Sequence, residues 1–284
     1  MTLAVQFNQA EKNELSLVGG KGYNLIRLYN EKLNVPNGFV VTTNAYFDFL
    51  KHNKITETVQ KKLKGLDVEN TKKLDKVSSE IRGILLKAEF PDILIKEIGN
   101  GIKKHGSKKF AVRSSSTAED LAKASFAGQQ DTYLNVERGK IAENVKKCFA
   151  SLFTSRAIYY REKNKFPHDV GIAVVVQEMV DADFSGVMFT VDPIHKKFLL
   201  IEIASGLGEK IVSGSITPNN YFLERNTFEI YEKHEEEKVN EEMVRKIADL
   251  GLKIEKHYKK PQDIEFAVKD GKIFILQSRP ITTL

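Results

Sequence analysis

The sequence feature that most constrains the fold is a predicted β-hairpin near the C-terminal end of the chain. Residues 263–268 alternate polar and apolar side chains, Lys269-Asp270-Gly271 supplies a turn, and residues 272–276 return as a second strand. Asp-Gly between two runs rich in β-branched and aromatic residues is a strong hairpin signal. We therefore predict an antiparallel strand pair here, with acidic side chains at alternate positions of its first strand.

The register of this hairpin decides what its polar side chains can do. A three-residue loop with Gly271 in the left-handed conformation pairs Asp263 with Gln277. It gathers on one face Asp263, Glu265, Gln277 and Arg279. A two-residue Asp-Gly turn shifts the pairing by one and separates the carboxylates from the other two groups. We predict the three-residue loop, which creates a site for a divalent cation and a phosphate; the alternative is an ordinary solvated sheet face.

Bulk properties exclude several classes of protein. The 284 residues suffice for one large or two medium domains, and the 44 basic and 38 acidic residues are mixed, with lysines dispersed through predicted helices. No basic block, zinc-finger spacing or RNA-binding aromatic motif indicates a nucleic-acid partner. No apolar run is long enough for a membrane span, and residues 1–20 lack a signal-peptide core, so we expect a cytoplasmic protein without membrane contact. The single cysteine, Cys148, excludes an intramolecular disulfide.

Helices and strands alternate irregularly along the chain. Predicted helices cover roughly 22–33, 54–105, 138–163 and 240–257, and predicted strands cover roughly 39–41, 110–112, 131–136, 171–180, 185–191, 198–203 and the terminal hairpin. This order favours an α+β fold over a barrel or a doubly wound sheet. We place a domain boundary at 180–181, so that residues 1–180 and 181–284 form two parts.

Glycine and arginine motifs in the first part are typical of phosphate binding. Gly19-Gly20-Lys21-Gly22 precedes a helix, where backbone amides and a lysine can hold an anion, although Gly22 replaces the Ser/Thr of a P-loop. The alternative is a glycine turn with an exposed lysine. Arg113 ends a short strand before three serines and can bind a phosphate with two hydrogen bonds, or can pair with Glu119 or Asp120.

Two further segments could contact a nucleotide. Residues 125–130 form a glycine-containing loop that could close over a ligand or could be an ordinary surface loop. The apolar strand that ends at Gln177-Glu178 could offer polar groups to a purine edge, or could be a core strand that ends in solvent. The six histidines are scattered without metal-ligand spacing.

The order of these segments is distinctive. The blocks that matter are Gly19–Gly22, Ala111–Ser115, Ala118–Asp120, Ser125–Gln129, Val176–Gln177, Ser185–Thr190, Gly206–Glu209 and Leu276–Pro280. Together they resemble the N-terminal ATP-binding domain of the phosphoenolpyruvate synthase, pyruvate phosphate dikinase and rifampin phosphotransferase family, over essentially the whole chain. The Ala-Val-Arg-Ser-Ser and Gln-Ser-Arg-Pro blocks are the most specific.

The resemblance implies an ATP-grasp-type fold with ATP between two subdomains, and it implies a role for each matching residue. Lys21 and Arg113 would hold ATP phosphates as catalytic residues, together with Arg279. The remaining nucleotide contacts would come from Gly128 and Thr132 for phosphate, from Gln177, Glu178 and the Val180 backbone for adenine, and from Asp263 beside the metal. Glu265 and Gln277 would bind Mg²⁺.

The family resemblance also implies a reaction and its partners. ATP would be cleaved to AMP, and the β-phosphoryl group would pass to a histidine on a separate swivelling domain, then to pyruvate or to an antibiotic hydroxyl. The family's phosphohistidine motif, in which Gly-Gly and Thr are followed by Cys-His, does not occur in this sequence. The swivelling domain that carries it, and the acceptor-binding domain, would therefore act in trans or belong to a longer chain. A non-catalytic nucleotide sensor is the alternative of another class. Asn219 departs from the aspartate usual after Thr-Pro, with an effect that the sequence leaves open.

Overall fold

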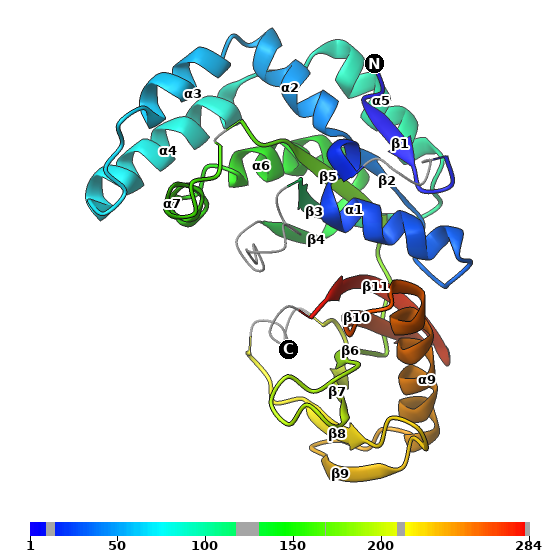
Figure 1. Cartoon of the computed structure of the whole chain (residues 1–284). Helices are drawn as coiled ribbons and strands as arrows, with labels where there is room; N and C mark the ends of the chain where they lie inside the picture. Colours follow the sequence, from blue (N-terminus) through cyan, green and yellow to red (C-terminus); the bar gives the residue numbers. More distant parts are fainter. Residues whose placement is uncertain (10–14, 118–130, 168, 209–213, 282–284) are drawn as a thin grey trace. The chain divides into compact units, whose positions relative to one another are not determined.

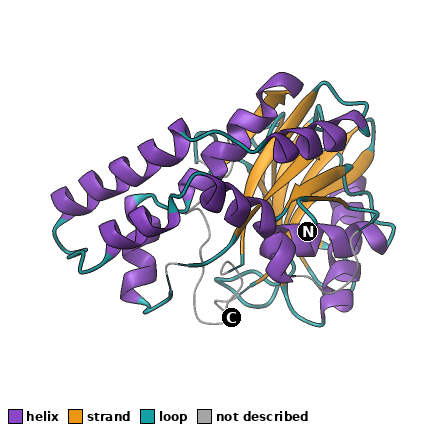
Figure 2. Cartoon of the chain, turned by 90° about the horizontal axis from the view of Figure 1, so that it is seen from above, coloured by secondary structure: helices purple, strands orange, loops and turns teal. Residues whose placement is uncertain are grey.

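The computed structural model describes residues 1–9, 15–117, 131–167, 169–208 and 214–281, and these residues divide into two compact units. The first unit comprises Met1–Arg27 and Asn37–Met179, and the second comprises Leu28–Pro36 and Val180–Leu284. Helices and strands are mixed throughout (Figures 1 and 2), and every strand pairing in the described residues is antiparallel. The α+β class is therefore confirmed.

The first unit is built on a five-stranded sheet of order β1-β2-β5-β3-β4. Its strands are β1 (Ala4–Gln6), β2 (Gly38–Val41), β3 (Lys109–Ser116), β4 (Thr132–Glu137) and β5 (Ile172–Glu178). Its helices are α2 (Thr43–His52), α3 (Thr56–Leu63), α4 (Thr71–Lys87), α5 (Asp92–Lys103), α6 (Ile141–Ser151) and α7 (Ser155–Lys163), with α1 (Leu15–Asn30) running across the boundary of the unit and a short 3₁₀ turn at Arg138–Lys140.

One face of this sheet forms the core with the helices. Phe110 and Val112 of β3 and Val174 and Val176 of β5 are fully buried in one hydrophobic cluster with side chains of α2, α4 and α6. Burial of apolar surface of this kind is the main favourable contribution to folding. The other face of the same strands carries polar residues, as described below.

The predicted single helix over 138–163 is wrong, because the chain forms two helices there. Helix α6 ends at Ser151, and the hydroxyl of Thr154 then accepts a hydrogen bond from the backbone N–H of Ala157. A threonine N-cap satisfies one of the open amides of a new helix start. The apolar spacing continues through the break, which is why a periodic pattern alone missed it.

The second unit is a six-stranded sheet of order β11-β10-β6-β7-β8-β9 with one long helix. Its strands are β6 (Phe184–Phe189), β7 (Leu199–Ser205), β8 (Asn219–Leu223), β9 (Ile230–His234), β10 (Gln262–Lys269) and β11 (Lys272–Pro280), and its helix is α9 (Glu241–Tyr258). Asn240 caps α9 through the N–H of Glu242, and acidic residues in the first turn with basic ones in the last complement the helix dipole.

A short N-terminal segment belongs to this second unit, although the predicted division at 180–181 assigned it to the first. The carbonyl of Asn34 accepts a hydrogen bond of 2.8 Å from the N–H of Ile275 on β11, and Glu31 lies 3.8 Å from the ring of His257 on α9. The residues that make these contacts are far apart in sequence, and no local pattern in residues 28–36 predicts the contacts. None of the described helices is long and apolar enough to cross a membrane.

Candidate functional site

The glycine run of α1 is held against β3 by close backbone contacts. Gly19 has φ +67°, and a Cβ at this position would lie 2.1 Å from the carbonyl oxygen of Ser115. The N–H of Gly22 donates to the Ser115 hydroxyl at 2.9 Å, and that hydroxyl donates to the carbonyl of Val18 at 2.8 Å. Gly19 interrupts the helix, so the predicted helical segment after the run exists, while α1 itself begins earlier, at Leu15. Only glycine fits this approach.

This arrangement places Lys21 beside the arginine strand. The Lys21 ammonium donates to the carbonyl of Ser114 at 3.0 Å, next to Arg113. Gly22 of the same helix lies against Val40 of β2, which pairs with Val175 of β5. Helix α1 therefore covers the sheet face opposite to the helical core (Figure 1).

Three of the predicted nucleotide-binding residues share that face. Arg113 is the direct cross-strand partner of Thr132 on β4 and of Val175 on β5, and Gln177 lies two positions along β5 from Val175. Paired residues and residues two apart in a strand point to the same side. Arg113 and Gln177 are 7% and 2% exposed in the chain as a whole. A cation and an amide on one sheet face are suited to an anionic, polar ligand.

The other predicted residues of this region differ in position. Glu178 pairs with Phe110 and so points to the opposite face from Gln177, where its carboxylate accepts a hydrogen bond from Ser107 N–H at 3.3 Å. Val180 follows the end of β5 and is assigned to the second unit. Gly128, the loop over 125–130 and the alternative Arg113 partners at 119 and 120 lie outside the described residues.

The terminal hairpin has a different turn from the predicted one. Lys269 pairs with Lys272, and the two residues between them, Asp270 and Gly271, both have positive φ, +49° and +71°. This is a two-residue type I′ turn, the connection that Asp-Gly favours because its twist matches that of the strands. The predicted three-residue loop is wrong.

A β-bulge nevertheless restores the predicted shared face. The register shifts between Glu265 and Phe266: Phe266 pairs with Ile275, whereas Glu265 pairs with Gln277, which leaves Leu276 as the extra residue. Beyond the bulge, Asp263 pairs with Arg279. Directly paired residues share a face, so the two acids, the amide and the guanidinium lie together as predicted. The extra residue, Leu276, lies in strand β11, whereas the predicted loop placed an extra residue in the turn.

The second half of this group is an ion pair between the buried Asp263 carboxylate and the partly exposed Arg279 guanidinium. Arg279 Nε and Nη2 donate to Oδ2 of Asp263 at 2.8 and 2.6 Å. Asp263 and Gln277 are each 8% exposed. Burial raises the pKa of the Asp263 carboxyl above its usual range, Arg279 opposes this shift, and the negative charge of Glu265 adds to it. A cation placed beside Glu265 would relieve that repulsion.

Glu202 is a further acid on this face that the sequence analysis did not select. It pairs with Val187 of β6, and Val187 also pairs with Glu265, so Glu202, Glu265 and Gln277 follow one row across the sheet. Burial raises the pKa of Glu202, and the charge of Asp263 adds to the increase. A single acid inside the apolar run 198–203 was the signal in the sequence.

The oxygen atoms on this face suit a hard cation that takes most of its ligands from groups other than protein side chains. Carboxylate and amide oxygens, as on Glu265 and Gln277, are groups that bind Mg²⁺. Within the described residues, no group of three or more His, Cys, Asp or Glu side chains is arranged to hold a metal. A magnesium ion here would therefore complete its shell with phosphate and water oxygens, as Mg²⁺ commonly does at nucleotide sites.

Asn219, the departure from the family pattern, has a defined structural role. It is 1% exposed; its Nδ2 donates to the carbonyl of Glu237 at 2.6 Å, and its Oδ1 accepts from the N–H groups of Glu236 and Glu237. The Glu237 carboxylate in turn accepts from the N–H and the hydroxyl of Ser205, where β7 leads into the Gly206 segment. The amide of Asn219 can donate the hydrogen bond to the Glu237 carbonyl, which an ionised aspartate could not.

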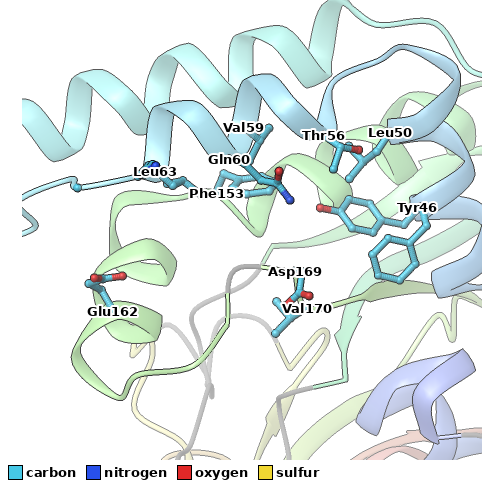
Figure 3. Close-up of a pocket in the computed structure, with 13 residues that line it drawn as sticks. Tyr46, Leu50, Thr56, Val59, Gln60, Leu63, Phe153, Glu162, Asp169 and Val170 are labelled. Carbon is cyan, nitrogen blue, oxygen red and sulfur yellow. The ribbon is translucent and has the colours of Figure 1, made fainter.

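A separate cavity of about 450 Å³ lies among the helices of the first unit. Figure 3 shows Tyr46, Leu50, Val59 and Phe153 among its lining residues. All four belong to the hydrophobic cluster of the helical core. The cavity is thus on the helical side of the sheet, and Arg113 and Gln177 are on the other side, so this cavity is distinct from the candidate site.

Comparison with known proteins gives consistent results. The family model for the pyruvate phosphate dikinase AMP/ATP-binding domain matches residues 15–241 and 229–284. The chain is 41% identical to a probable phosphoenolpyruvate synthase of Methanocaldococcus jannaschii, over 100% of this chain and 27% of that protein. It is 40% identical to a rifampicin phosphotransferase of Bacillus cereus, over 100% of this chain and 36% of that protein. The chain therefore spans about a quarter to a third of the length of these two relatives.

The solved structure of D-alanine–D-alanine ligase from Helicobacter pylori matches with a TM-score of 0.33 and 10% identity, over 66% of this chain and 47% of that one, which is too weak a likeness to carry an argument. The family model has greater weight because it spans nearly all of the chain. The two antiparallel sheets with their helices agree with the ATP-grasp-type fold expected for this family. The chain belongs to the pyruvate phosphate dikinase AMP/ATP-binding domain family.

Proposed function

We propose that this chain binds Mg-ATP as the nucleotide-binding part of a phosphoenolpyruvate synthase-like dikinase. The proposed enzyme cleaves ATP to AMP and passes the β-phosphoryl group to a histidine on a separate domain or subunit. The observation that carries the proposal is the register of β10 and β11, which sets Glu265 opposite Gln277 and Asp263 opposite Arg279. The names of the relatives, which are phosphotransferases, support the same class of reaction.

Each predicted residue has a role in this proposal. Lys21, Arg113 and Arg279 hold phosphate oxygens and neutralise their charge, and Thr132 and Gly128 add contacts to the phosphates. Phosphoryl transfer requires mainly positioning and charge stabilisation, which such cations supply without a protein base. Adenine contacts come from Gln177 and from the backbone of the strand end that follows it.

Magnesium would be held by Glu265 and Gln277, whose paired positions and oxygen donors fit it. When bound, Mg²⁺ offsets negative charge on the phosphates. The chain's own contribution is orientation: Arg279 ties Asp263 through two hydrogen bonds and fixes the polar row of β10 and β11.

A rifampin phosphotransferase is a second candidate, because the Bacillus cereus relative is 40% identical over the whole chain. The two candidates share the ATP half-reaction and differ in the final acceptor. A nucleotide sensor without turnover is the remaining alternative, and it differs from both in forming no AMP.

Two measurements test the proposal. Calorimetric titration with Mg-ATP should show saturable binding that Lys21→Ala and Arg279→Ala weaken. Addition of a phosphohistidine domain in trans should yield AMP and a phosphorylated histidine. Saturable binding without AMP formation would favour the sensor. If the unaltered chain shows no saturable binding of Mg-ATP, and the two variants behave in the same way, every candidate function is contradicted. Pyruvate and rifampicin, offered in turn as acceptors, separate the two enzymes.

A further inference from the structure

The end of strand β5 is tied to the segment that precedes β3 through one side chain. The Glu178 carboxylate accepts a hydrogen bond of 3.3 Å from the N–H of Ser107, and its Oε1 lies 3.6 Å from Nδ1 of His105. The backbone joins the same segments, since the N–H of Met179 donates to the carbonyl of Lys109 at 3.1 Å. The position of this strand end therefore depends on what holds residues 105–109.

His105 is the most firmly held member of that segment. Its side chain is 6% exposed, it stacks on Phe39 with ring centroids 5.9 Å apart, and it meets Phe110 edge to face at 6.2 Å. Its Nε2 lies 2.9 Å from Oε1 of Gln6 on β1, within hydrogen-bond distance. A ring fixed on two sides and at one nitrogen can serve as a rigid support for Glu178.

Arg138 fixes the backbone of the same segment. Its Nε donates to the carbonyl of Ser107 at 2.8 Å, and its Nη2 donates to the carbonyl of His105. Its guanidinium also lies 6.0 Å from the centre of the Phe110 ring. The segment thus has little freedom of its own, and the Glu178 side chain transmits that rigidity to the end of β5.

We infer that His105, supported by Gln6, is a positioning residue that acts through Glu178 to set the selectivity of this chain for adenine over guanine nucleotides. The inference rests on the proposed function, in which the end of β5 frames the base. Adenine and guanine present opposite donor and acceptor patterns on the edge that such a strand end reads, so a small shift of the strand end alters the preference. Lys21 and Arg113, which would hold phosphates, lie on the face of the sheet opposite to Glu178, so we expect phosphate binding to depend less on this support.

The test uses the full 284-residue chain and three ligands with Mg²⁺: ATP, GTP and inorganic tripolyphosphate. His105→Phe keeps the ring packing between Phe39 and Phe110 but removes both nitrogens. We expect the ratio of ATP to GTP affinity to fall by about tenfold, which corresponds to about 1.4 kcal/mol. Tripolyphosphate affinity should stay within about twofold. His234→Phe is the matched control, because His234 also lies beside a glutamate, at 3.0 Å, but on the exposed strand β9.

A second variant separates positioning from a general loss of structure. Glu178→Leu should lower the same ratio, and the double variant should be no worse than either single one, because both break one connection. Gln6→Leu provides the same test if His105→Phe does not fold, as judged by its thermal unfolding. An unchanged ratio of ATP to GTP affinity, or a loss of tripolyphosphate affinity equal to the loss of ATP affinity, would overturn the inference. The proposed function would still stand if the unaltered chain binds Mg-ATP. Failure of the unaltered chain to bind Mg-ATP would instead remove the proposed function.

Discussion

The two sheets hold their polar side chains in place by different means. In the first unit, contacts with backbone atoms hold them: Gly19 and Gly22 bring α1 onto Ser115, and the Lys21 ammonium donates to the carbonyl of Ser114. In the second unit, the group depends on charge, through the pair of Asp263 and Arg279, and on a shift of strand register. The first arrangement should therefore be sensitive to added atoms, and the second to changes of charge and turn.

The largest effect is expected from an added methyl group in the first unit. Gly19→Ala would place a Cβ 2.1 Å from the Ser115 carbonyl at a φ of +67°, and we expect the free energy of unfolding of this unit to fall. The combined backbone strain and overpacking should cost roughly 2–5 kcal/mol. Denaturant unfolding followed by circular dichroism measures this loss.

Gly65→Ala is the control for that experiment. Gly65 has nearly the same φ, +68°, but nothing lies within 4 Å of an added Cβ, so only the conformational cost of about 1–2 kcal/mol should remain. Equal losses for the two variants would show that the close approach to Ser115 contributes nothing.

A change of charge should be felt most in the second unit. Glu265→Gln removes the charge beside Asp263 and should lower Mg-ATP affinity by about 10–100-fold, while it relieves repulsion and does not reduce stability. Calorimetry and thermal unfolding measure the two properties. Glu232→Gln, at an exposed acid of the same unit, should alter neither. A loss of stability in Glu265→Gln equal to its loss of affinity would contradict the assigned role.

His105 of the first unit, and Asp263 and Glu202 of the second, should contribute to stability with opposite dependence on acid. Burial lowers the pKa of His105 below its usual range, although Glu178 opposes the shift, so the unfolded chain takes up this proton first and the first unit loses stability as pH falls below about 6.5. The pKa values of Asp263 and Glu202 are raised, so the folded second unit takes up these protons first, and their contribution improves as pH falls towards about 4.

Hydrogen-exchange protection between pH 7 and 5, corrected for intrinsic rates, should fall in β5 and not in β10. The variant His105→Phe should remove the decrease in β5. A parallel decrease in both strands, unchanged in the variant, would contradict this difference between the units.

The smallest effect concerns the turn of the hairpin. Gly271 has φ +71° and open space around an added Cβ, so Gly271→Ala should destabilise the second unit by about 1 kcal/mol through strain alone. Gly83 lies inside helix α4 with the same open space, and Gly83→Ala should stabilise the first unit by about 0.5–1 kcal/mol. Thermal unfolding of both variants gives the signs, and a common sign would refute the conformational explanation.

The hairpin shows which structural features the sequence pattern can predict and which it cannot. Alternation of polar and apolar residues correctly predicted that Asp263, Glu265, Gln277 and Arg279 share a face, because that alternation reflects burial of the other face. It could not locate the extra residue, since a longer loop and a bulge at Leu276 give the same outcome. The bulge lies within the β10–β11 pairing itself, and the Asp-Gly turn signal does not show where along the two strands an extra residue sits.

Other differences have similar physical reasons. Alternation along β5 already implies that Gln177 and Glu178 point to opposite faces, and the predicted shared role overlooked it. Glu202 joins the polar row only through two pairings across Val187, a non-local relation. The roles of Lys21, Arg113 and the hairpin residues remain predictions that the experiments above address.

The path of the chain between the units has a consequence for how the protein can be divided. Because Leu28–Pro36 belongs to the second unit, the backbone passes from one unit to the other three times, after Arg27, Pro36 and Met179. A cut at residue 180 would leave β11 without the Asn34 carbonyl that receives the N–H of Ile275. A single break in the gene at this point would therefore separate residues 28–36 from the sheet and the helix that they contact. An exchange of the second unit between relatives would have to carry residues 28–36 along with residues 180–284.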